Sequence, residues 1–345
     1  MIITNNPFLF IFQYIFDNLH LALWQIVLIF AIIFAIPLIF PLYELWRKKE
    51  GKLNVDLLYS RSPDYWGKSY LNLLLCTLSN NLNNIKSFDD IKNIEADVLL
   101  ELNFCFDKGK DKFFITKDFV KNIEKITNAK KINFIVLNTN NSVLDKSFVF
   151  DKEVIIFGDL ILNSECIFNS LIVLGDLYIN SKTRVLKFLH VEGKVFINNE
   201  INIGNIFYAS DSISVLAPVA YKRIFSPRII SKEDIDEHKY LNVEENKRIE
   251  ISGNMKVEGK LNIESKEKYV IIDGNLICNS DLKLAGNVWA KNNVFSQENI
   301  FLSDGVIVGV SNKIKSVVAR KKVVINGKVK IYGYVHSEQE SIINP

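Results

Sequence analysis

Three histidines follow the first 50 residues, and histidine is the side chain best suited to acid–base catalysis near neutral pH. His190 lies in the segment LHVEGK, His238 lies in a charged stretch, and His336 lies close to the end of the chain. Catalysis by such a base requires a nucleophile or a carboxylate held beside it. None of the three has such a partner in a recognisable motif nearby. We therefore predict no catalytic residue, and we interpret His190 as an ordinary surface residue.

The sequence gives little indication of metal or phosphate chemistry. The segment GNMKVEGKL, from Gly253 to Leu261, is similar to a phosphate-binding loop. However, five residues separate its glycines where four are needed, and Leu261 stands where a Ser or Thr would hold magnesium. The four cysteines are far apart and form no C-x-x-C pair, which predicts free thiols in a reducing compartment. They are Cys76, Cys105, Cys166 and Cys278. We expect no bound metal and no cofactor.

A nine-residue phrase recurs through the C-terminal half of the chain. Its clearest copies are VIIFGDLIL, LIVLGDLYI, LHVEGKVFI, IEISGNMKV, VIIDGNLIC, LKLAGNVWA, FLSDGVIVG and VVINGKVKI. Their central glycines are Gly158, Gly175, Gly193, Gly253, Gly274, Gly286, Gly305 and Gly327. Apolar residues stand two and four positions from most of these glycines, which is a period of two. Each phrase therefore reads as an extended segment with one inward face, and the glycine marks a corner or a narrow core.

The spacing of the phrases predicts a parallel β-solenoid, in which each coil buries its apolar face by stacking on the next coil. Most neighbouring glycines lie about 17 to 22 residues apart, which accommodates one phrase and one return path per coil. A β-sandwich would also contain many short strands, but it should show hairpin turns every 8 to 12 residues or so. The predicted fold class is mainly β, with a small α/β region before the solenoid.

Many outward-facing positions of the phrases carry apolar or aromatic side chains where water should select polar ones. From these positions we choose five candidate interface residues, which are Ile155, Ile172, Tyr178, Phe196 and Trp289. Apolar stripes of this kind mark surfaces that meet something else. The preceding α/β region, another copy of the chain or a partner protein could cover them. Packing against the chain's own insertion is the alternative.

An enzyme is the competing hypothesis, because hexapeptide-repeat acyltransferases are also β-solenoids and use a histidine as a general base. It would require a pocket around His190 or His336. A strict six-residue period is absent from most of the chain, although Gly253 and Gly259, and Gly327 and Gly333, lie six residues apart. The sequence favours a protein without enzymatic activity.

Residues 19–43 form a run without any formally charged side chain, long enough to cross the hydrocarbon layer as a helix. Arg47, Lys48, Lys49 and Lys52 follow this run, whereas no Lys or Arg precedes it. The positive-inside rule then places the N-terminus outside and the rest of the chain in the cytoplasm. We expect a single-pass protein of the cell inner membrane with an uncleaved anchor, because a basic start and a small-residue cleavage site are both missing.

These patterns divide the chain into three parts. Residues 1–46 are the predicted membrane anchor, residues 47–150 a tether and a small α/β region, and residues 151–345 the solenoid. The glycine phrase lapses over residues 205–247, which we interpret as an insertion extruded from one coil. The formal net charge is only +3, which argues against nucleic-acid binding.

The repeated GDL, GKV and GNL phrases and the paired glycines of ISGNMKVEGKLNI and VINGKVKIYGYV resemble the bactofilins, a family of bacterial polymer-forming cytoskeletal proteins. The resemblance covers about residues 151–335. It implies a β-solenoid that self-associates without nucleotide, lies beneath the membrane, and acts as a scaffold for cell-envelope or cell-shape machinery.

The chain departs from the bactofilin pattern in its membrane anchor, its folded region before the solenoid and its insertion. These additions could block end-to-end stacking. The alternative to a self-assembling scaffold is therefore a membrane adaptor that does not polymerise and binds a separate filament or an envelope complex.

Overall fold

The structure is a computed structural model that describes Tyr14 and residues 64–345, apart from residues 83–84, 95–96, 103, 105–109 and 127–129. The predicted membrane span at residues 19–43 and the tether that follows it lie outside the described residues. Among the residues that are described, no helix is both long enough and apolar enough to cross a membrane. Residues 62–345 form one compact unit.

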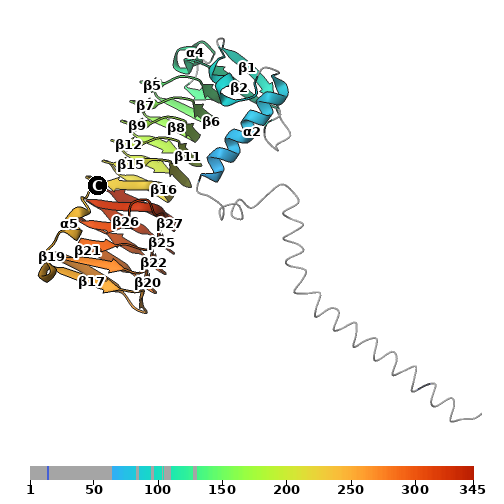
Figure 1. Cartoon of the computed structure of the whole chain (residues 1–345). Coiled ribbons are helices and arrows are strands. Elements are labelled where there is room, and N and C mark those ends of the chain that lie inside the picture. Colours follow the sequence, from blue (N-terminus) through green and yellow to red (C-terminus); the bar gives the residue numbers. More distant parts are fainter. Residues whose placement is uncertain are drawn as a thin grey trace, which may run out of the picture. The chain divides into compact units, whose positions relative to one another are not determined.

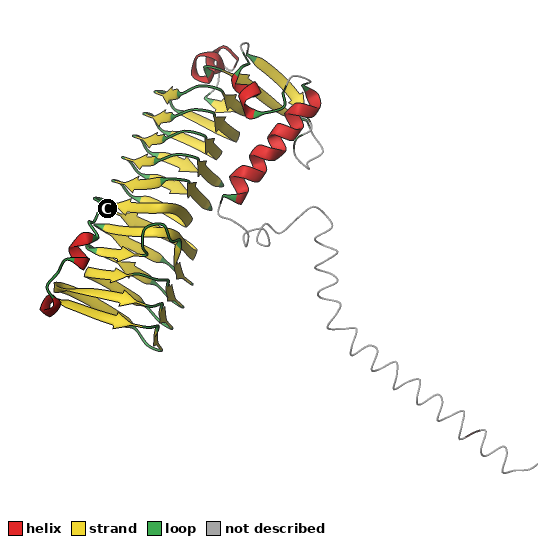
Figure 2. Cartoon of the chain, viewed as in Figure 1, coloured by secondary structure: helices red, strands yellow, loops and turns green. Residues whose placement is uncertain are grey.

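Parallel strands stacked in coils build the first half of this unit, and this confirms the predicted solenoid (Figures 1 and 2). Three parallel ladders run along this first stack, which spans residues 131–231. Its strands are β3 (Lys131–Ile132), β4 (Ile135–Asn138), β5 (Ser142–Leu144), β6 (Phe148–Ile156), β7 (Leu160–Leu162), β8 (Cys166–Val173), β9 (Leu177–Ile179), β10 (Thr183–Val185), β11 (Phe188–Val191), β12 (Val195–Ile197), β13 (Ile201–Ile203), β14 (Ile206–Ala209), β15 (Ser212–Val215) and β16 (Val219–Ser231).

After β16 the chain passes through the short helices α5 (His238–Leu241) and η2 (Glu245–Lys247) and starts a second stack, residues 248–344, at the far end of this compact unit (Figure 1). Each later coil of this second stack lies closer to the first stack. Its strands are β17 (Arg248–Ser252), β18 (Met255–Val257), β19 (Leu261–Asp273), β20 (Leu276–Cys278), β21 (Leu282–Ala290), β22 (Val294–Ser296), β23 (Ile300–Leu302), β24 (Val306–Val308), β25 (Lys315–Ala319), β26 (Val323–Asn326) and β27 (Val329–Asn344). The C-terminus therefore lies midway along the stacked coils.

The two stacks meet where their last coils, β16 and β27, pair with each other. This pairing is antiparallel, whereas the coils within each stack pair in parallel. Val219 lies opposite Ile343, and Ser231 lies opposite Val329, so the whole length of each last coil takes part in the junction. The sequence predicted a single solenoid and gave no sign of this reversal.

One hydrophobic core runs through both stacks, because the inward residues of successive coils pack on one another. The rings of Phe150 and Phe168, from neighbouring coils, are stacked with their centroids 5.0 Å apart. The helix α4 (Phe119–Ile126) covers the beginning of this core, where Phe119 and Ile123 are fully buried. The region before the solenoid thus covers the start of its core.

The remaining N-terminal elements pack against one side of the first stack. They are α2 (Tyr65–Asn81), α3 (Phe88–Lys92), β1 (Val98–Leu102) and β2 (Asp111–Thr116). β1 pairs antiparallel with β2, and β2 joins the solenoid as a parallel neighbour of β4. Leu71, Leu74 and Leu78 are the buried apolar residues of α2, and they share a core with the outward residues of the stack. We call this the helix-covered side.

The structure moves two boundaries that we predicted. The first coil begins at Lys131, within the region assigned to residues 47–150, since β3 and β4 pair in parallel with β6. The predicted insertion at residues 205–247 is narrower, because β14, β15 and β16 continue the coils to Ser231. Glycine is dispensable in this last coil, where the Ser226 hydroxyl bonds the backbone of the corner. Of the predicted insertion, only residues 232–247 lie outside the stack.

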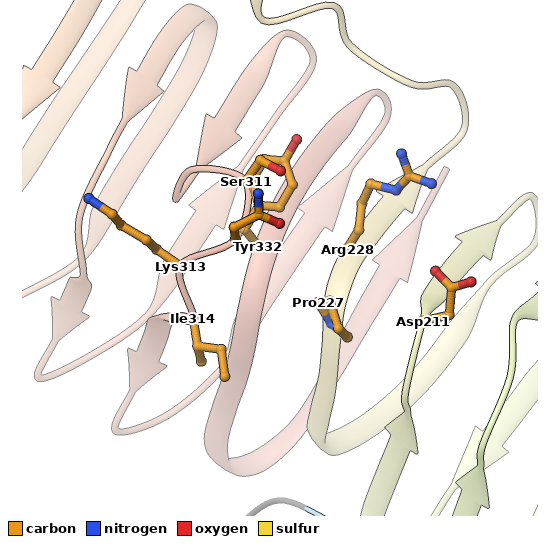
Figure 3. A pocket seen from close by; sticks show the side chains of 8 residues that line it. Asp211, Pro227, Arg228, Ser311, Lys313, Ile314 and Tyr332 are labelled. Atoms are coloured by element: carbon orange, nitrogen blue, oxygen red, sulfur yellow. The ribbon is translucent and has the colours of Figure 1, made fainter.

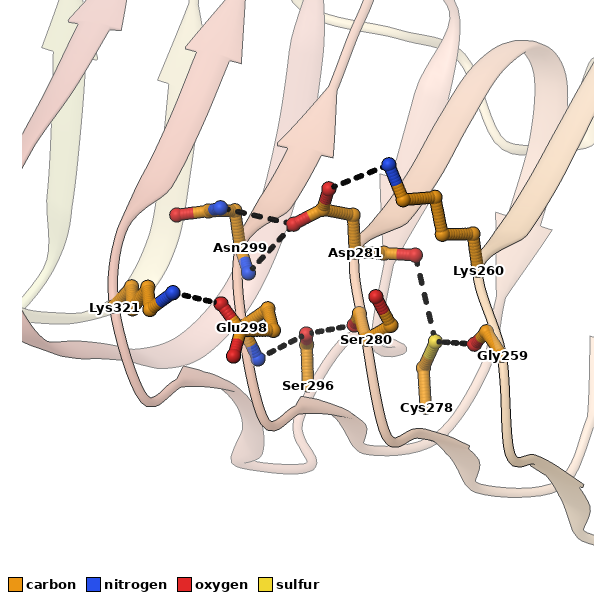
Figure 4. A network of polar contacts seen from close by, with 9 residues as sticks. All are labelled: Gly259, Lys260, Cys278, Ser280, Asp281, Ser296, Glu298, Asn299 and Lys321. Carbon is orange, nitrogen blue, oxygen red and sulfur yellow. Dashed lines mark hydrogen bonds and ion pairs between the residues drawn. The ribbon is translucent and has the colours of Figure 1, made fainter.

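Polar side chains at the corners bond one coil to the next. Asp159 Oδ1 accepts a hydrogen bond from the backbone N–H of Asp176 at 2.8 Å, and Asp176 Oδ1 accepts one from Lys194 at 2.7 Å. A corner of the second stack repeats the arrangement, where Asp281 accepts hydrogen bonds from Asn299 (Figure 4). The polar residues that follow Gly158 and Gly175 therefore bond their coils to the next, a role that the sequence pattern alone did not explain.

The hydroxyl group of Tyr221 lies inside the apolar core, and its removal provides a test of the packing there. Its side chain is fully buried, burial raises its pKa above the usual range, and no described residue hydrogen-bonds its hydroxyl. A buried hydroxyl without a partner is destabilising by about 1–3 kcal/mol. We expect Tyr221→Phe to raise the free energy of unfolding by about 1 kcal/mol in urea denaturation. Tyr240→Phe is the control with the opposite sign, because the Tyr240 hydroxyl donates to Gly305 O. A loss of stability in Tyr221→Phe would contradict this account.

Candidate interaction surface

An apolar column lies on another side of the first stack, which we call the open side. Val143, Ile161, Tyr178 and Phe196 are direct neighbours on successive coils and make up this open column. Val143 is 44% exposed, and the other three are half-buried. The rings of Tyr178 and Phe196 are nearly parallel, and their centroids are 4.8 Å apart. The column is thus a rigid row of apolar and aromatic side chains that is partly exposed to solvent.

The local sequence explains why these side chains line up. Each strand that carries the open column has three residues, and its two outer residues are buried in the core. Because side chains alternate along a strand, the middle residue must then point outward. The parallel register puts the middle residues of neighbouring coils opposite one another. Rungs of a sheet lie about 4.8 Å apart, which matches the spacing of the two rings.

The open side continues past the junction into the second stack, where the chain covers it. Ile230 pairs with Lys330, and the outward residues that follow are Ile307, Trp289 and Ile271. Ile235 and Tyr240, from the segment 232–247, pack on these residues in a small separate core. Trp289 is 4% exposed, and its indole N–H donates to Gly309 O at 2.8 Å. Trp289 is therefore unavailable to a partner.

Lys330 binds the segment 232–247 to the second stack. Its ammonium group is almost fully buried and lies 2.8 Å from Asp234 Oδ1, 3.0 Å from Glu237 Oε1 and 3.0 Å from Ile235 O. Burial alone would lower the pKa of Lys330, but Asp234, Tyr332 and Glu237 reverse that effect and raise it. Lys330 is thus held as a cation beneath the segment.

Ile155 and Ile172 lie on the helix-covered side and are fully buried against the α2 region. His190 lies in the same outward column, and the prediction that it is a surface residue is wrong, because it is only 2% exposed. Its ring stacks on Tyr208 with 4.6 Å between centroids, and its Nε2 lies 2.8 Å from Glu192 Oε1. This hydrogen bond lowers the pKa of Glu192, and burial raises the pKa of Tyr208 to about 12.

Of the five residues chosen from the sequence, only Tyr178 and Phe196 remain accessible, and they lie side by side. Ile155 and Ile172 are covered by α2 and its neighbours, whereas Trp289 is covered by the segment 232–247. Sequence reasoning missed Val143, which extends the open column by one coil. The alternation in SVL, residues 142–144, could have indicated it, but that segment lacks the glycine that marks the other copies.

Two hollows contain groups that could take part in other chemistry. One, of about 310 Å³, lies at the junction and is lined by Asp211, Arg228, Lys313 and Tyr332, among others (Figure 3). It carries charges of both signs and so favours neither anions nor cations. The other, of about 290 Å³, includes His336, whose pKa is lowered by burial and by the nearby Arg223. Cys278 lines the same hollow, but its thiol bonds backbone carbonyls.

The described part of the chain contains no group of three or more His, Cys, Asp or Glu side chains that could hold a metal ion. The fold and the open column together define the class of this protein, which is a parallel β-solenoid with an apolar surface on its side. No protein-family model, curated protein or solved structure matches the chain.

Proposed function

We propose that this protein is a structural scaffold anchored in the cell inner membrane, with an architecture like that of the bactofilins, and that it organises cell-envelope or cell-shape machinery. The uncharged run at residues 19–43 and the basic residues that follow it support the anchor. The stacked coils support the scaffold role, because a solenoid presents a long, stiff surface whose side chains repeat at fixed spacing.

The single observation that carries this proposal is the open column. Exposed apolar side chains that form a continuous row mark interaction surfaces, and tyrosine is over-represented among the residues that dominate binding energy. The chain covers the equivalent row of the second stack with its own segment 232–247 and leaves Ile161, Tyr178 and Phe196 uncovered. A partner protein with an apolar ridge fits this row.

The covered start of the solenoid favours one version of the scaffold over another. Phe119 and Ile123 of α4 fill the end of the first stack, so a further coil cannot stack there without displacing the helix. A filament that grows by adding solenoids at both ends is therefore disfavoured. The adaptor version, in which the open side binds a separate filament or an envelope complex, is the version we adopt.

The test is the double substitution Tyr178→Glu and Phe196→Glu in the full-length protein. Each substitution places a charge in the proposed contact, and losing one dominant contact of about 2 kcal/mol weakens binding about 30-fold. We expect a tagged variant to lose, by at least that factor, the proteins that co-purify with the wild type from membranes, and to lose its cellular position. Unchanged co-purification would refute the proposed docking surface.

The matched control places two glutamates elsewhere on the same coils. Arg184 and Asn202 are neighbours in register and point outward on a different side of the first stack. Arg184→Glu with Asn202→Glu should leave co-purification unchanged. If both double variants lose the partner equally, the added negative charge is responsible and the column is not.

A further inference from the structure

The second stack begins with an uncovered coil, unlike the first. This open coil comprises β17, β18 and the first part of β19, residues 248–265, and each segment pairs with the following coil only. Its other edge has no partner among the described residues. Strand edges with unpaired N–H and C=O groups readily pair with another chain. The open coil lies at one end of the stacked coils, as Figure 1 shows near β17.

The core is also incomplete at this end. The open coil has six inward apolar residues, and every one is partly exposed or exposed: Ile249, Ile251, Met255, Val257, Leu261 and Ile263. The next coil buries its equivalents, Val270, Ile272, Leu276, Cys278, Leu282 and Leu284. Ile249 alone is 41% exposed, whereas Val270 beside it is 6% exposed. The open coil therefore lacks a layer that the rest of the stack has.

The sequence of the open coil has nearly the same pattern in both directions. It reads RIEISGNMKVEGKLNIE over residues 248–264, with Lys256 at the centre. Around that centre Met255 corresponds to Val257, Ile251 to Leu261, Ile249 to Ile263, and Gly253 to Gly259. Arg248 corresponds to Glu264, which has the opposite charge. An antiparallel copy of this coil would therefore place apolar residues opposite apolar ones, glycine corners opposite glycine corners, and arginine opposite glutamate.

The chain already contains one antiparallel junction between the ends of two stacks. In the pairing of β16 with β27, the start of one coil lies opposite the end of the other. Ile224 and Val335, which both point into the core, face each other at the middle of that junction. Two solenoid ends can thus join with inward residues matched to inward residues, which is the arrangement that the pattern of the open coil allows.

We infer that two copies of this chain join through their open coils in antiparallel register, about a two-fold axis that passes beside Lys256. A second copy is the occupant that fits, because a two-fold interface requires a self-complementary surface, and the open coil is one. The start of the first stack is covered by α4, so the assembly stops at two copies. This inference concerns the end of the solenoid and holds whether or not the open side binds a partner.

The two Lys256 side chains are the one unfavourable pair in this register. Each Lys256 Nζ lies 3.0 Å from Glu258 Oε1 of its own chain. In this register Glu258 of each copy lies opposite Asn254 of the other copy. It is therefore a diagonal neighbour of the other copy's Lys256, two residues along the strand. Two lysines and two glutamates then surround the axis, and their charges balance.

Disulfide cross-linking tests the register directly. Residues directly opposite each other in antiparallel strands have Cα atoms about 4.5–5.5 Å apart, within reach of a disulfide. Only a residue on the axis lies opposite itself. We expect Lys256→Cys, in full-length protein in membranes with Cys76 and Cys105 replaced by serine, to form a covalent dimer on mild oxidation. Ile277→Cys is the matched control, because Ile277 is the neighbour of Lys256 one coil further from the end.

The expected result is at least a tenfold excess of covalent dimer in Lys256→Cys over Ile277→Cys. A second variant, Ile249→Glu with Ile263→Glu, should halve the mass of the detergent-solubilised protein in light scattering, since it places charges in the interface. Equal cross-linking at positions 256 and 277 would overturn the proposed register. A wild-type protein that is monomeric at about 100 µM, or one that forms long polymers, would overturn the two-copy assembly.

Discussion

Replacing Gly175 with alanine is expected to lower the free energy of unfolding by about 3 kcal/mol, the upper part of the usual range for overpacking. A Cβ atom on Gly175 would lie 2.7 Å from the carbonyl carbon of Gly158 and 2.8 Å from the backbone nitrogen of Asp159. Both atoms belong to the backbone of the preceding coil, which cannot rotate away as a flexible side chain can. The coils would have to separate at this corner.

The opposing effect is smaller. Alanine reduces the freedom of the unfolded chain, which stabilises a protein by about 0.4–1 kcal/mol where the folded conformation tolerates it. The steric cost in the folded state therefore exceeds this gain, and we expect the substitution to be destabilising. Urea denaturation followed by circular dichroism measures the change. Lys182→Ala is the control, because Lys182 is exposed on the same turn of the chain and its ion pair with Glu200 lies at the surface, where such pairs contribute about 0–1 kcal/mol.

A double variant separates backbone crowding from side-chain crowding. The atom nearest to the added Cβ is Asp159 Oδ1, at 2.3 Å. If that carboxylate were the only obstacle, Gly175→Ala combined with Asp159→Ala would cost no more than Asp159→Ala alone. We expect the double variant to remain less stable than Asp159→Ala, because the backbone contacts persist. Recovery to the level of Asp159→Ala would show that the corner does not need a glycine.

The repeat could be predicted from the sequence because its signal is local. Inward and outward positions alternate within nine residues, and at corners such as Gly175 and Gly193 the adjacent coil leaves no room for a side chain. The reason for that glycine was only partly foreseen. We attributed it to a corner or a narrow core, and Gly175 and Gly193 lie at corners where the corner of the coil before them crowds them.

The antiparallel junction could not be predicted, because its partners are remote in the sequence and no local pattern specifies their order. β16 lies about a hundred residues before β27, and a parallel continuation would have required the same apolar alternation. The reversal follows from the path of residues 232–247, which carry the chain to the far end before the second stack begins. The sequence of this charged segment does not indicate where in the fold the chain continues after it.

The candidate surface was predicted in part for a related reason. The period of two shows which side chains point outward from a coil, but it does not show what covers them. Ile155 and Tyr178 both occupy outward positions of their phrases, yet the α2 region covers Ile155 and leaves Tyr178 partly exposed. His190 was misjudged in the same way, since Gly67 of α2 packs directly on its ring. Coverage depends on tertiary contacts that alternation does not encode.

Replacing Lys330 with methionine is expected to detach the segment 232–247 from the second stack. Methionine keeps the apolar length of the side chain and removes the charge that Asp234 and Glu237 share. Breaking a buried ion pair from one side destabilises by about 3–5 kcal/mol. Since Asp234 is about half exposed, we expect the lower value, about 3 kcal/mol, and a rise of about 150-fold in the open population of the segment.

Limited proteolysis at low protease concentration reports this population, because cleavage then follows the equilibrium between closed and open forms. Tryptophan fluorescence reports it independently through Trp289, which the segment covers. Lys328→Met is the matched control. Lys328 pairs with Glu233 of the same segment, but that ion pair is at the surface and contributes about 0–1 kcal/mol, so cleavage should rise less than about fivefold.

Neutralising the acids should restore the segment, because the expected loss comes from unpaired carboxylates and not from missing packing. Asp234→Asn and Glu237→Gln remove both negative charges and keep hydrogen-bonding groups in place. Removing both sides of a buried ion pair avoids the cost of leaving one charge buried without its partner. The triple variant should therefore resist protease nearly as well as the wild type, while Lys330→Met alone does not. If the triple variant is as labile as Lys330→Met, the apolar contacts of Ile235 and Tyr240 do not hold the segment without the lysine, and the ion pairs are its main attachment.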